Sequence, residues 1–258
     1  PASATALRDA TEWLGLTWDR VDVQSQFADA HADALDRLAA AGRLYPCACS
    51  RAVRTGGRRA PDGGWAYDNR CRDRGLPPGG WRVATEPLRA RLDDGWIEVS
   101  DESGVELGQS AAYDMGDPVV RRRDGAIAYQ LAVVVDDAAA CVSRVVRGRD
   151  IAPSTATQVG LARLLNLPVP AYRHHFLLLE SRAGQKLAKL HGSIGYQVLR
   201  MSMTADEMRG FLGHAAGLLP AATPSSLAEL ARAFSWSRVR TDDVVVENRA
   251  GRIVVSAG

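Results

Sequence analysis

The sequence has no long apolar run, few cysteines and almost no net charge. No stretch of the 258 residues is apolar for long enough to cross a bilayer, and no signal peptide is visible. The net charge of +2 predicts that any nucleic-acid partner is met by a local patch. Three of the four cysteines are clustered, which suits a metal in a reducing compartment better than a disulfide framework. We therefore expect a cytoplasmic protein that makes no membrane contact.

The remaining composition fits a globular chain. Hydrophobic residues make up 46% of the sequence and charged residues 24%, which is enough for one or two domains with a core. Cys141 stands alone in an apolar stretch, and we interpret it as a small core residue. No internal repeats are found.

The clustered cysteines have the spacing of a metal site. Cys47 and Cys49 lie in YPCACSR, and Cys71 follows a Gly-rich stretch in AYDNRC. Tetrahedral zinc takes about four ligands, so three thiols leave one position open, and Tyr67 could supply an unusual oxygen ligand. On spacing alone, three buried or idle cysteines remain an alternative.

Periodicity predicts helices near both ends of the chain. Apolar residues recur at helical spacing over residues 5–16 and 27–40, and Gly42 is a plausible stop for the second helix. Thr204 and Glu207 form a capping box for a helix over 205–216, and a last helix covers 225–234. The run VVVENRAGRIVV is typical of a terminal hairpin.

The middle of the chain indicates an α/β sheet. The nearly continuous apolar run over 126–137 predicts a strand buried on both faces, and residues 142–148 and 174–180 predict two more. Ser154 is expected to cap a helix that runs to about residue 166. Strand, helix and strand at this spacing imply a right-handed crossover in a doubly wound sheet. Residues 52–80 are expected to be loop, and 81–112 short strands of an inserted sheet.

Several separate motifs resemble one family. They are WLGLTWD, YPCACSR, GDPVVRRRDGAIAYQLAVVVDD, VVRGRD, STATQ, PAYRHH and GQKLAK. In this order they resemble the catalytic core of the glutamyl-tRNA synthetases, and most of all its short glutamyl-queuosine tRNA(Asp) branch. The resemblance covers about residues 5–200.

The resemblance implies a fold and a division of the chain. It implies an α/β class I synthetase fold, a Rossmann-like doubly wound parallel sheet with an inserted zinc-binding subdomain and a small C-terminal helical region. The expected segments are a helical remainder of the first Rossmann half at residues 1–45 and the zinc-binding insertion at 46–112. The second Rossmann half with the lysine loop follows at 113–200, and a helical region with a hairpin at 201–258.

The resemblance also implies an activity. Members of the branch activate glutamate as an adenylate with ATP and Mg²⁺ and pass it to the queuosine base of tRNA(Asp). We expect a monomeric ligase that takes glutamate, ATP and tRNA and holds Zn²⁺. Two alternatives stay open, namely a non-catalytic binding protein on the synthetase fold and transfer of glutamate to an acceptor other than tRNA.

Site residues follow from the family motifs. The resemblance assigns zinc to Cys47, Cys49, Tyr67 and Cys71, and glutamate to Tyr129 and Arg147. It assigns the ATP phosphates to the catalytic lysines Lys186 and Lys189, in a loop where Ala188 replaces the usual serine. A guanidinium matches a carboxylate bidentately, although a salt bridge from Arg147 to Asp136, Asp137 or Asp150 is an alternative.

Two further features concern ATP and RNA. The family begins with a His-x-Gly-His loop that binds ATP, and the sequence starts after that point, so we expect natural residues upstream of Pro1. Seven arginines crowd the metal loop, at positions 51, 54, 58, 59, 70, 72 and 74. They could contact phosphates of a tRNA, or they could only keep an exposed loop soluble.

Overall fold

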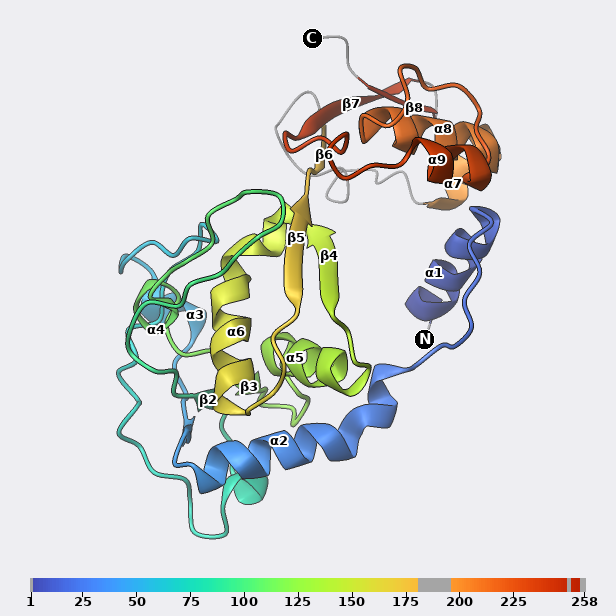
Figure 1. Ribbon diagram of the computed structural model, residues 1–258. Helices are drawn as coiled ribbons and strands as arrows, with labels where there is room; N and C mark the ends of the chain where they lie inside the picture. The colour runs from blue at the N-terminus through green and yellow to red at the C-terminus, as the bar shows by residue number, and fades with distance from the viewer. Residues whose placement is uncertain (1, 181–195, 250–251, 256–258) are drawn as a thin grey trace. The chain divides into compact units, whose positions relative to one another are not determined.

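The computed structural model describes residues 2–180, 196–249 and 252–255 (Figure 1). The chain divides into two compact units, Asp22–His174 and a second that combines Pro1–Val21 with His175–Gly258. None of the helices in the described ranges is long and apolar enough to span a membrane. The four segments expected from the sequence stay a prediction.

The unit Asp22–His174 contains two small sheets and the helices around them. Its helical elements are η1 (Gln24–Phe27), α2 (Ala28–Ala40), α3 (Arg51–Arg54), η2 (Trp81–Val83), α4 (Ala111–Asp114), α5 (Tyr129–Ala139), η3 (Arg149–Ser154) and α6 (Thr155–Leu164). Its strands are β1 (Leu44–Pro46), β2 (Leu88–Ala90), β3 (Val119–Arg121), β4 (Arg144–Gly148) and β5 (Ala171–His175). Strands β1, β2 and β3 form an antiparallel sheet, and β4 pairs with β5.

Helix α2 forms where the apolar spacing predicted it. It buries His31, Leu35 and Leu38 on one face, and Gly42 adopts a φ of +66° just beyond its end. Glycine takes this left-handed conformation without a steric penalty, so the predicted stop is confirmed.

The predicted strand–helix–strand crossover is formed by β4, α6 and β5. Strands β4 and β5 run in the same direction (Figure 1), and the Ala171 N–H donates to the Ser143 carbonyl at 2.9 Å. Residues 155–162 of α6 are all buried. Ser154 is the N-cap, but its hydroxyl accepts from the Gln130 side chain and not from the helix backbone.

The expected strand over 126–137 is wrong, because residues 129–137 lie in helix α5. The helix buries Leu131, Ala132, Val134 and Val135, and it packs against α2, α6 and β3. A helix covered on several sides is apolar nearly all round, so its sequence looks like that of a buried strand. Ala128 precedes it without any side-chain cap, so no start signal marked the helix.

Cys141 is exposed, so the interpretation as a core residue is also wrong. It follows the end of α5 with a φ of 55°, and the next residue, Val142, donates its N–H back to the Asp137 carbonyl. This is the left-handed turn that ends many helices, and it turns the side chain outward.

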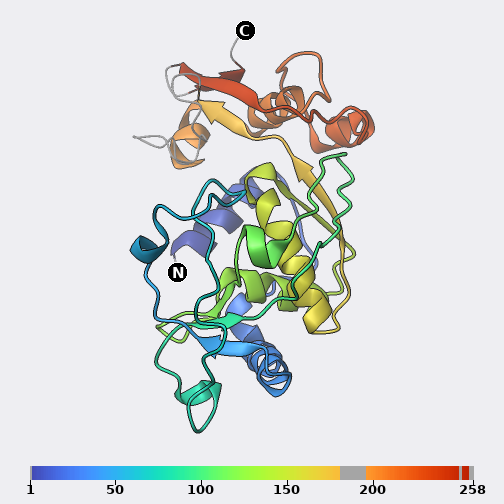
Figure 2. The ribbon, with the colours of Figure 1, turned by 90° about the vertical axis from the view of Figure 1, so that its left-hand side faces the viewer.

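The segment between β1 and α4 is mostly irregular (Figure 2). The loop expected over 52–80 is confirmed, apart from the end of the short helix α3. Of the strands expected over 81–112, only β2 forms, together with isolated bridges between Ile97 and Gln109 and between Asp101 and Tyr172. The single strand expected over 174–180 is divided, since β5 ends at His175 and a new strand begins at Leu178.

The second unit has its own sheet and core. It contains α1 (Ala2–Trp13), β6 (Leu178–Glu180), α7 (Tyr196–Ser202), α8 (Ala205–Ala215), α9 (Leu227–Ala233), β7 (Val244–Arg249) and β8 (Arg252–Val255). Strand β7 lies between β6, which is parallel to it, and β8, which is antiparallel. The predicted capping box of Thr204 and Glu207 starts α8, and the predicted hairpin is formed by β7 and β8.

Candidate active site and metal centre

Arg147 is held at the end region of β4 by three neutral side chains. Its Nε donates to His174 Nε2 at 3.0 Å, its Nη1 to Gln158 Oε1 at 2.7 Å and its Nη2 to Thr155 Oγ1 at 2.8 Å. A guanidinium has five N–H donors, so one donor remains on each terminal nitrogen. Two donors on neighbouring nitrogens are what a carboxylate accepts from arginine.

The aspartates considered as ion-pair partners of Arg147 do not form a salt bridge with it. Asp136 accepts from Gln24 at 2.7 Å and lies 2.6 Å from the buried His31. Burial raises the pKa of Asp137, and the positive charge of Arg147 opposes that rise. Within the described part of the chain, Arg147 forms no ion pair with Asp136, Asp137 or Asp150. Its charge is therefore influenced by nearby carboxylates without being neutralised by direct contact.

A buried aspartate fixes the ring that supports Arg147. His174 Nδ1 lies 2.5 Å from Asp101 Oδ2, and both side chains are fully buried. Because the Arg147 Nε–H donates to Nε2, the ring proton must be on Nδ1 and is donated to Asp101. Burial by itself would raise the pKa of Asp101, but hydrogen bonds from Ser103 and His174 hold it below its ordinary value.

Helix α5 brings a second layer of contacts to this cluster. Gln158 Nε2 donates to Gln130 Oε1 at 2.9 Å, so the start of α5 is tied to α6. Tyr172 is also nearby, with the Arg147 guanidinium carbon 5.2 Å from the centre of its ring. Together these contacts leave Arg147 little rotational freedom.

Of the residues predicted to bind glutamate and ATP, the structure describes two and leaves two outside its described ranges. Arg147 is confirmed as part of β4, while Tyr129 is the first residue of α5 and not part of a strand, with 51% of its surface exposed. Lys186 and Lys189 lie outside the described residues. The analysis of single residues missed Asp101, Thr155, Gln158 and His174 as site residues. The motifs STATQ and PAYRHH contain three of them, but Asp101 carries no local signal.

Cys47, Cys49 and Cys71 come together around one point. Their sulfur atoms all lie within 4.8 Å of one another, and Cys49 Sγ is 3.6 Å from Cys71 Sγ. Tyr67 completes the group, because its hydroxyl oxygen is 3.3 Å from Cys47 Sγ and accepts from the Cys71 N–H at 3.1 Å. The three cysteines and Tyr67 form what we call the metal cluster, which could bind a metal ion.

The surroundings of the metal cluster change its acidity. Burial alone would raise the pKa of the Cys47 thiol, but hydrogen bonds from Tyr67 and Arg89 lower it to about 7. Burial, with the neighbouring Cys71 thiol, raises the pKa of Cys49 to about 11. Burial also raises the pKa of Tyr67. A cation in the cluster would favour the ionised form of each ligand, so metal affinity should increase with pH.

Asp117 binds Tyr45, which packs against the metal cluster, and Gly116 lies directly against Tyr67. The fully buried Asp117 carboxylate accepts from the Tyr45 hydroxyl at 2.7 Å and from Arg72 at 2.6 and 2.8 Å. Gly116 has a φ of +82°, and a Cβ there would lie 2.2 Å from the Tyr67 carbonyl oxygen. Only glycine therefore permits this close approach.

The seven arginines of the metal loop fall into different groups. Arg70, Arg72 and Arg74 form ion pairs, with Asp68, with Asp94 and Asp117, and with Glu86. Arg58 and Arg59 instead stack on aromatic rings, at 3.5 Å from the centre of Tyr113 and 3.9 Å from that of Trp65. The charges of Arg58 and Arg59 are thus not neutralised by an ion pair among the described residues.

The chain was compared with known families and proteins. Residues 2–212 match the model described as tRNA synthetases class I (E and Q), catalytic domain. A "Glutamyl-Q tRNA(Asp) synthetase" of Aromatoleum aromaticum is 42% identical over 194 residues, which cover 73% of this chain and 58% of the relative. Those of Thiobacillus denitrificans and Symbiobacterium thermophilum are 39% and 40% identical and cover 88% and 90% of this chain, and 74% and 76% of the relatives.

A solved structure shows the same fold. The glutamate tRNA ligase of Elizabethkingia meningosepticum superposes with a TM-score of 0.73 at 20% identity, covering 95% of this chain and 57% of that one. The fold is thus a class I synthetase-like α/β fold with a parallel sheet, as expected. The chain spans between 58% and 76% of the length of the curated relatives named above.

Proposed function

The chain belongs to the catalytic-domain family of the class I tRNA synthetases for glutamate and glutamine, and we propose from this that it activates glutamate and transfers it to the queuosine base of tRNA(Asp). The first half-reaction forms a bond between a glutamate carboxylate oxygen and the α-phosphorus of ATP and releases pyrophosphate. In the second, a hydroxyl of the acceptor attacks the carbonyl carbon and releases AMP. The names of the curated relatives support this choice of acceptor.

The proposal rests on the hydrogen bonds that the Arg147 guanidinium forms and on the donors that it keeps for a ligand. Three neutral partners orient its guanidinium, and two N–H donors remain for a carboxylate. A carboxylate accepts both, whereas the amide of glutamine offers only one oxygen to them, so the site prefers glutamate. Tyr129, at the exposed start of α5, is proposed as a further hydrogen-bond donor to the substrate.

The lysines and the metal cluster complete the proposal. Lys186 and Lys189 are proposed to stabilise charge on the ATP phosphates during the first half-reaction, for which Mg²⁺ accompanies the nucleotide. Cys47, Cys49, Tyr67 and Cys71 are proposed to hold structural Zn²⁺. Zn–S bonds of about 2.3 Å place two tetrahedral sulfur ligands about 3.8 Å apart, and the 3.6 Å between Cys49 Sγ and Cys71 Sγ fits that spacing.

One assay tests the function directly. The purified full-length protein is incubated with ATP, labelled glutamate and tRNA(Asp), either carrying queuosine or lacking the modification. We expect label on the modified tRNA alone, and glutamate-dependent exchange of pyrophosphate into ATP. A natural full-length protein that binds glutamate but forms no adenylate and labels no RNA would instead be a binding protein on the synthetase fold.

A further inference from the structure

Arg89 carries a buried positive charge that no carboxylate among the described residues pairs with. It lies in β2 and is 6% exposed. Every buried aspartate and histidine of the described ranges lies against an ionisable partner, in the pairs His31–Asp136, Asp101–His174 and Asp117–Arg72. Arg89 is different, because it forms no ion pair within the part of the chain that the structure describes. A charge taken out of water is costly unless an opposite charge lies nearby.

The neighbours of Arg89 place its guanidinium on the metal cluster. Its Nη1 donates to the backbone carbonyl of Asp117, and its central carbon lies 3.7 Å from the centre of the Tyr67 ring. Its charge also acts on the Cys47 thiol. The Asp117 carboxylate is already neutralised, because it accepts two hydrogen bonds from Arg72 at 2.6 and 2.8 Å. The groups left to balance the charge of Arg89 are therefore the metal ligands themselves.

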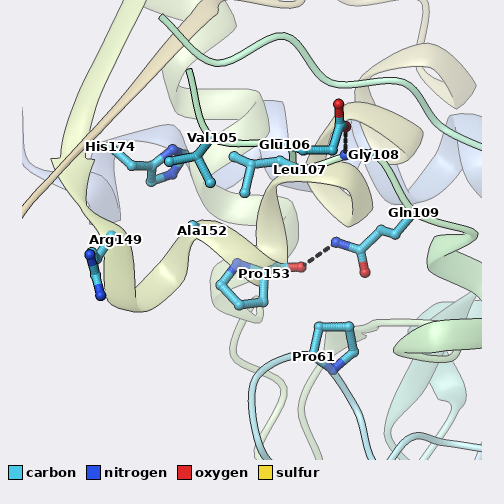
Figure 3. Close-up of a pocket in the computed structure, with 10 residues that line it drawn as sticks. All are labelled: Pro61, Val105, Glu106, Leu107, Gly108, Gln109, Arg149, Ala152, Pro153 and His174. Atoms are coloured by element: carbon cyan, nitrogen blue, oxygen red, sulfur yellow. Dashed lines mark hydrogen bonds between the residues drawn. The ribbon is translucent and has the colours of Figure 1, made fainter. Parts of the chain in front are cut away.

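An unused hydrogen bond would not by itself distinguish Arg89. Arg89 Nε is buried and has no hydrogen-bond partner among the described residues, but the same holds for Gln109 Oε1. Figure 3 shows the amide of Gln109, whose Nε2 donates to the Pro153 carbonyl at 2.9 Å. A neutral amide with one unused oxygen costs far less free energy than an unpaired charge. The charge of Arg89 is therefore the feature that needs a counterpart.

A zinc-filled metal cluster would supply the opposite charge. Cysteines bind Zn²⁺ as thiolates. One Zn²⁺ with Cys47, Cys49 and Cys71 therefore carries one net negative charge when Tyr67 binds through its neutral hydroxyl. The single positive charge of Arg89 cancels it. Without the guanidinium, a negatively charged centre would be buried with no counter-charge, and the cost would be seen as weaker zinc binding.

We propose that Arg89 is the buried counter-ion of the metal cluster, a positioning residue that balances the zinc–thiolate centre and covers the face of the Tyr67 ring. This inference rests on the Zn²⁺ site of the proposed function. Strand β2 lies between β1 and β3, and Tyr45 of β1 is opposite Arg89 in the register. Arg89 thus links the metal to the antiparallel sheet, and its charge determines how tightly the ion is held.

The first test measures the Kd of Zn²⁺ for the full-length protein by competition with a chromophoric chelator. Arg89→Gln keeps an N–H donor for the Asp117 carbonyl but removes the charge, so it should raise the Kd about tenfold or more. Arg89→Lys keeps the charge and should stay within about threefold of the wild type. Arg91→Gln is the matched control, because Arg91 is exposed just beyond the end of β2, and it should leave the Kd unchanged. An unchanged Kd for Arg89→Gln, or equal losses for Arg89→Gln and Arg89→Lys, would overturn the inference.

A second test separates a counter-ion from a residue that only packs in β2. Arg89→Gln is combined with Cys47→Ala, which is expected to lose the zinc. A packing role would lower the Tm equally in both backgrounds, and that result would contradict the inference. A counter-ion role lowers the Tm of the zinc-loaded protein by several degrees and leaves that of the Cys47→Ala protein unchanged or higher, because there the cation has no partner. If Arg89→Gln fails to fold, Arg89→Met takes its place in both tests.

Failure of the proposed function gives a different result. A wild type that binds Zn²⁺ but shows no glutamate-dependent pyrophosphate exchange would disprove the activity and leave the Kd comparison valid. A wild type that binds no Zn²⁺ would overturn this inference together with the proposed metal.

Discussion

The metal cluster and the Arg147 site differ in how far apart in the sequence their residues lie. All four residues of the metal cluster fall between positions 47 and 71, and their spacing is visible as a motif. The Arg147 site combines Arg147 of β4 with Asp101, with Thr155 and Gln158 of α6, and with His174 of β5, which are four separate segments. A local cluster can thus be found from spacing, while a site assembled by a fold shows only its most distinctive member, here Arg147.

The largest expected effect is loss of the metal cluster. We expect the purified protein to carry one zinc ion, and Cys47→Ala to remove it and destabilise the fold by about 3 kcal/mol or more. That corresponds to a decrease in Tm of roughly 6–12 °C. Metal analysis and thermal unfolding measure both quantities.

Cys141→Ala is the matched control, since Cys141 is exposed and outside the cluster. It should keep the zinc and the Tm of the wild type. A zinc content unaffected by Cys47→Ala would contradict the local assignment of the site.

The next largest effect is expected from Arg147, the residue proposed to bind the glutamate carboxylate. Arg147→Ala removes two charge-assisted hydrogen bonds to the substrate, so glutamate affinity should fall by about 3 kcal/mol, or on the order of 100-fold. Calorimetry on the full-length protein would measure this, and the wild type should bind glutamine much more weakly than glutamate. Arg144→Ala is the control, because Arg144 lies on the same strand and pairs with Glu102 at 2.9 Å. Equal losses from both variants would argue against a specific role of Arg147.

A smaller effect is expected from substitution of Asp101, the buried residue that holds the His174 ring beside Arg147. Asp101→Asn cannot accept the Nδ1 proton of His174 in the same way, so the ring should present an N–H toward Arg147 and disturb its position. We expect about tenfold weaker glutamate binding.

The same variant should alter the pH dependence of stability. The folded pKa of Asp101 is depressed, so its contribution is present above the unfolded value of about 3.9 and is lost as the pH falls through the lower folded value. The Tm difference between wild type and Asp101→Asn should therefore be constant above about pH 5 and shrink as the pH falls below about 4. A difference that stays constant below about pH 4 would mean that Asp101 is not an ionised support.

The smallest effect separates the arginines of the metal loop. Arg59 stacks on Trp65, whereas the charge of Arg70 is paired with Asp68. Arg59→Ala should weaken tRNA binding a few-fold and lower the salt dependence by about 0.7–0.9 in log–log slope. Arg70→Ala should change either quantity less. Filter binding at several salt concentrations measures both, and identical behaviour of the two variants would favour an exposed loop without RNA contacts.

Particular elements show where prediction from the sequence succeeded and where it failed. Helix α2 with Gly42, the capping box at Thr204 and the β7–β8 hairpin were predicted correctly, because each depends on contacts within a few residues. Helix α5 was predicted as a strand, because burial against α2, α6 and β3 makes its sequence uniformly apolar. Tyr129 was misplaced with it, and Cys141 was assigned to the core for the same reason.

The sequence by itself determined the family, from a series of motifs along the chain, and it showed the cysteine spacing of the metal cluster within 25 residues. The role of Arg147 stays a prediction. Only the tertiary structure decided the partners of Arg147. Asp101 meets His174 across 73 positions. Whether Arg147 forms a salt bridge or is held by neutral side chains depended on which side chains α6 and β5 bring to β4.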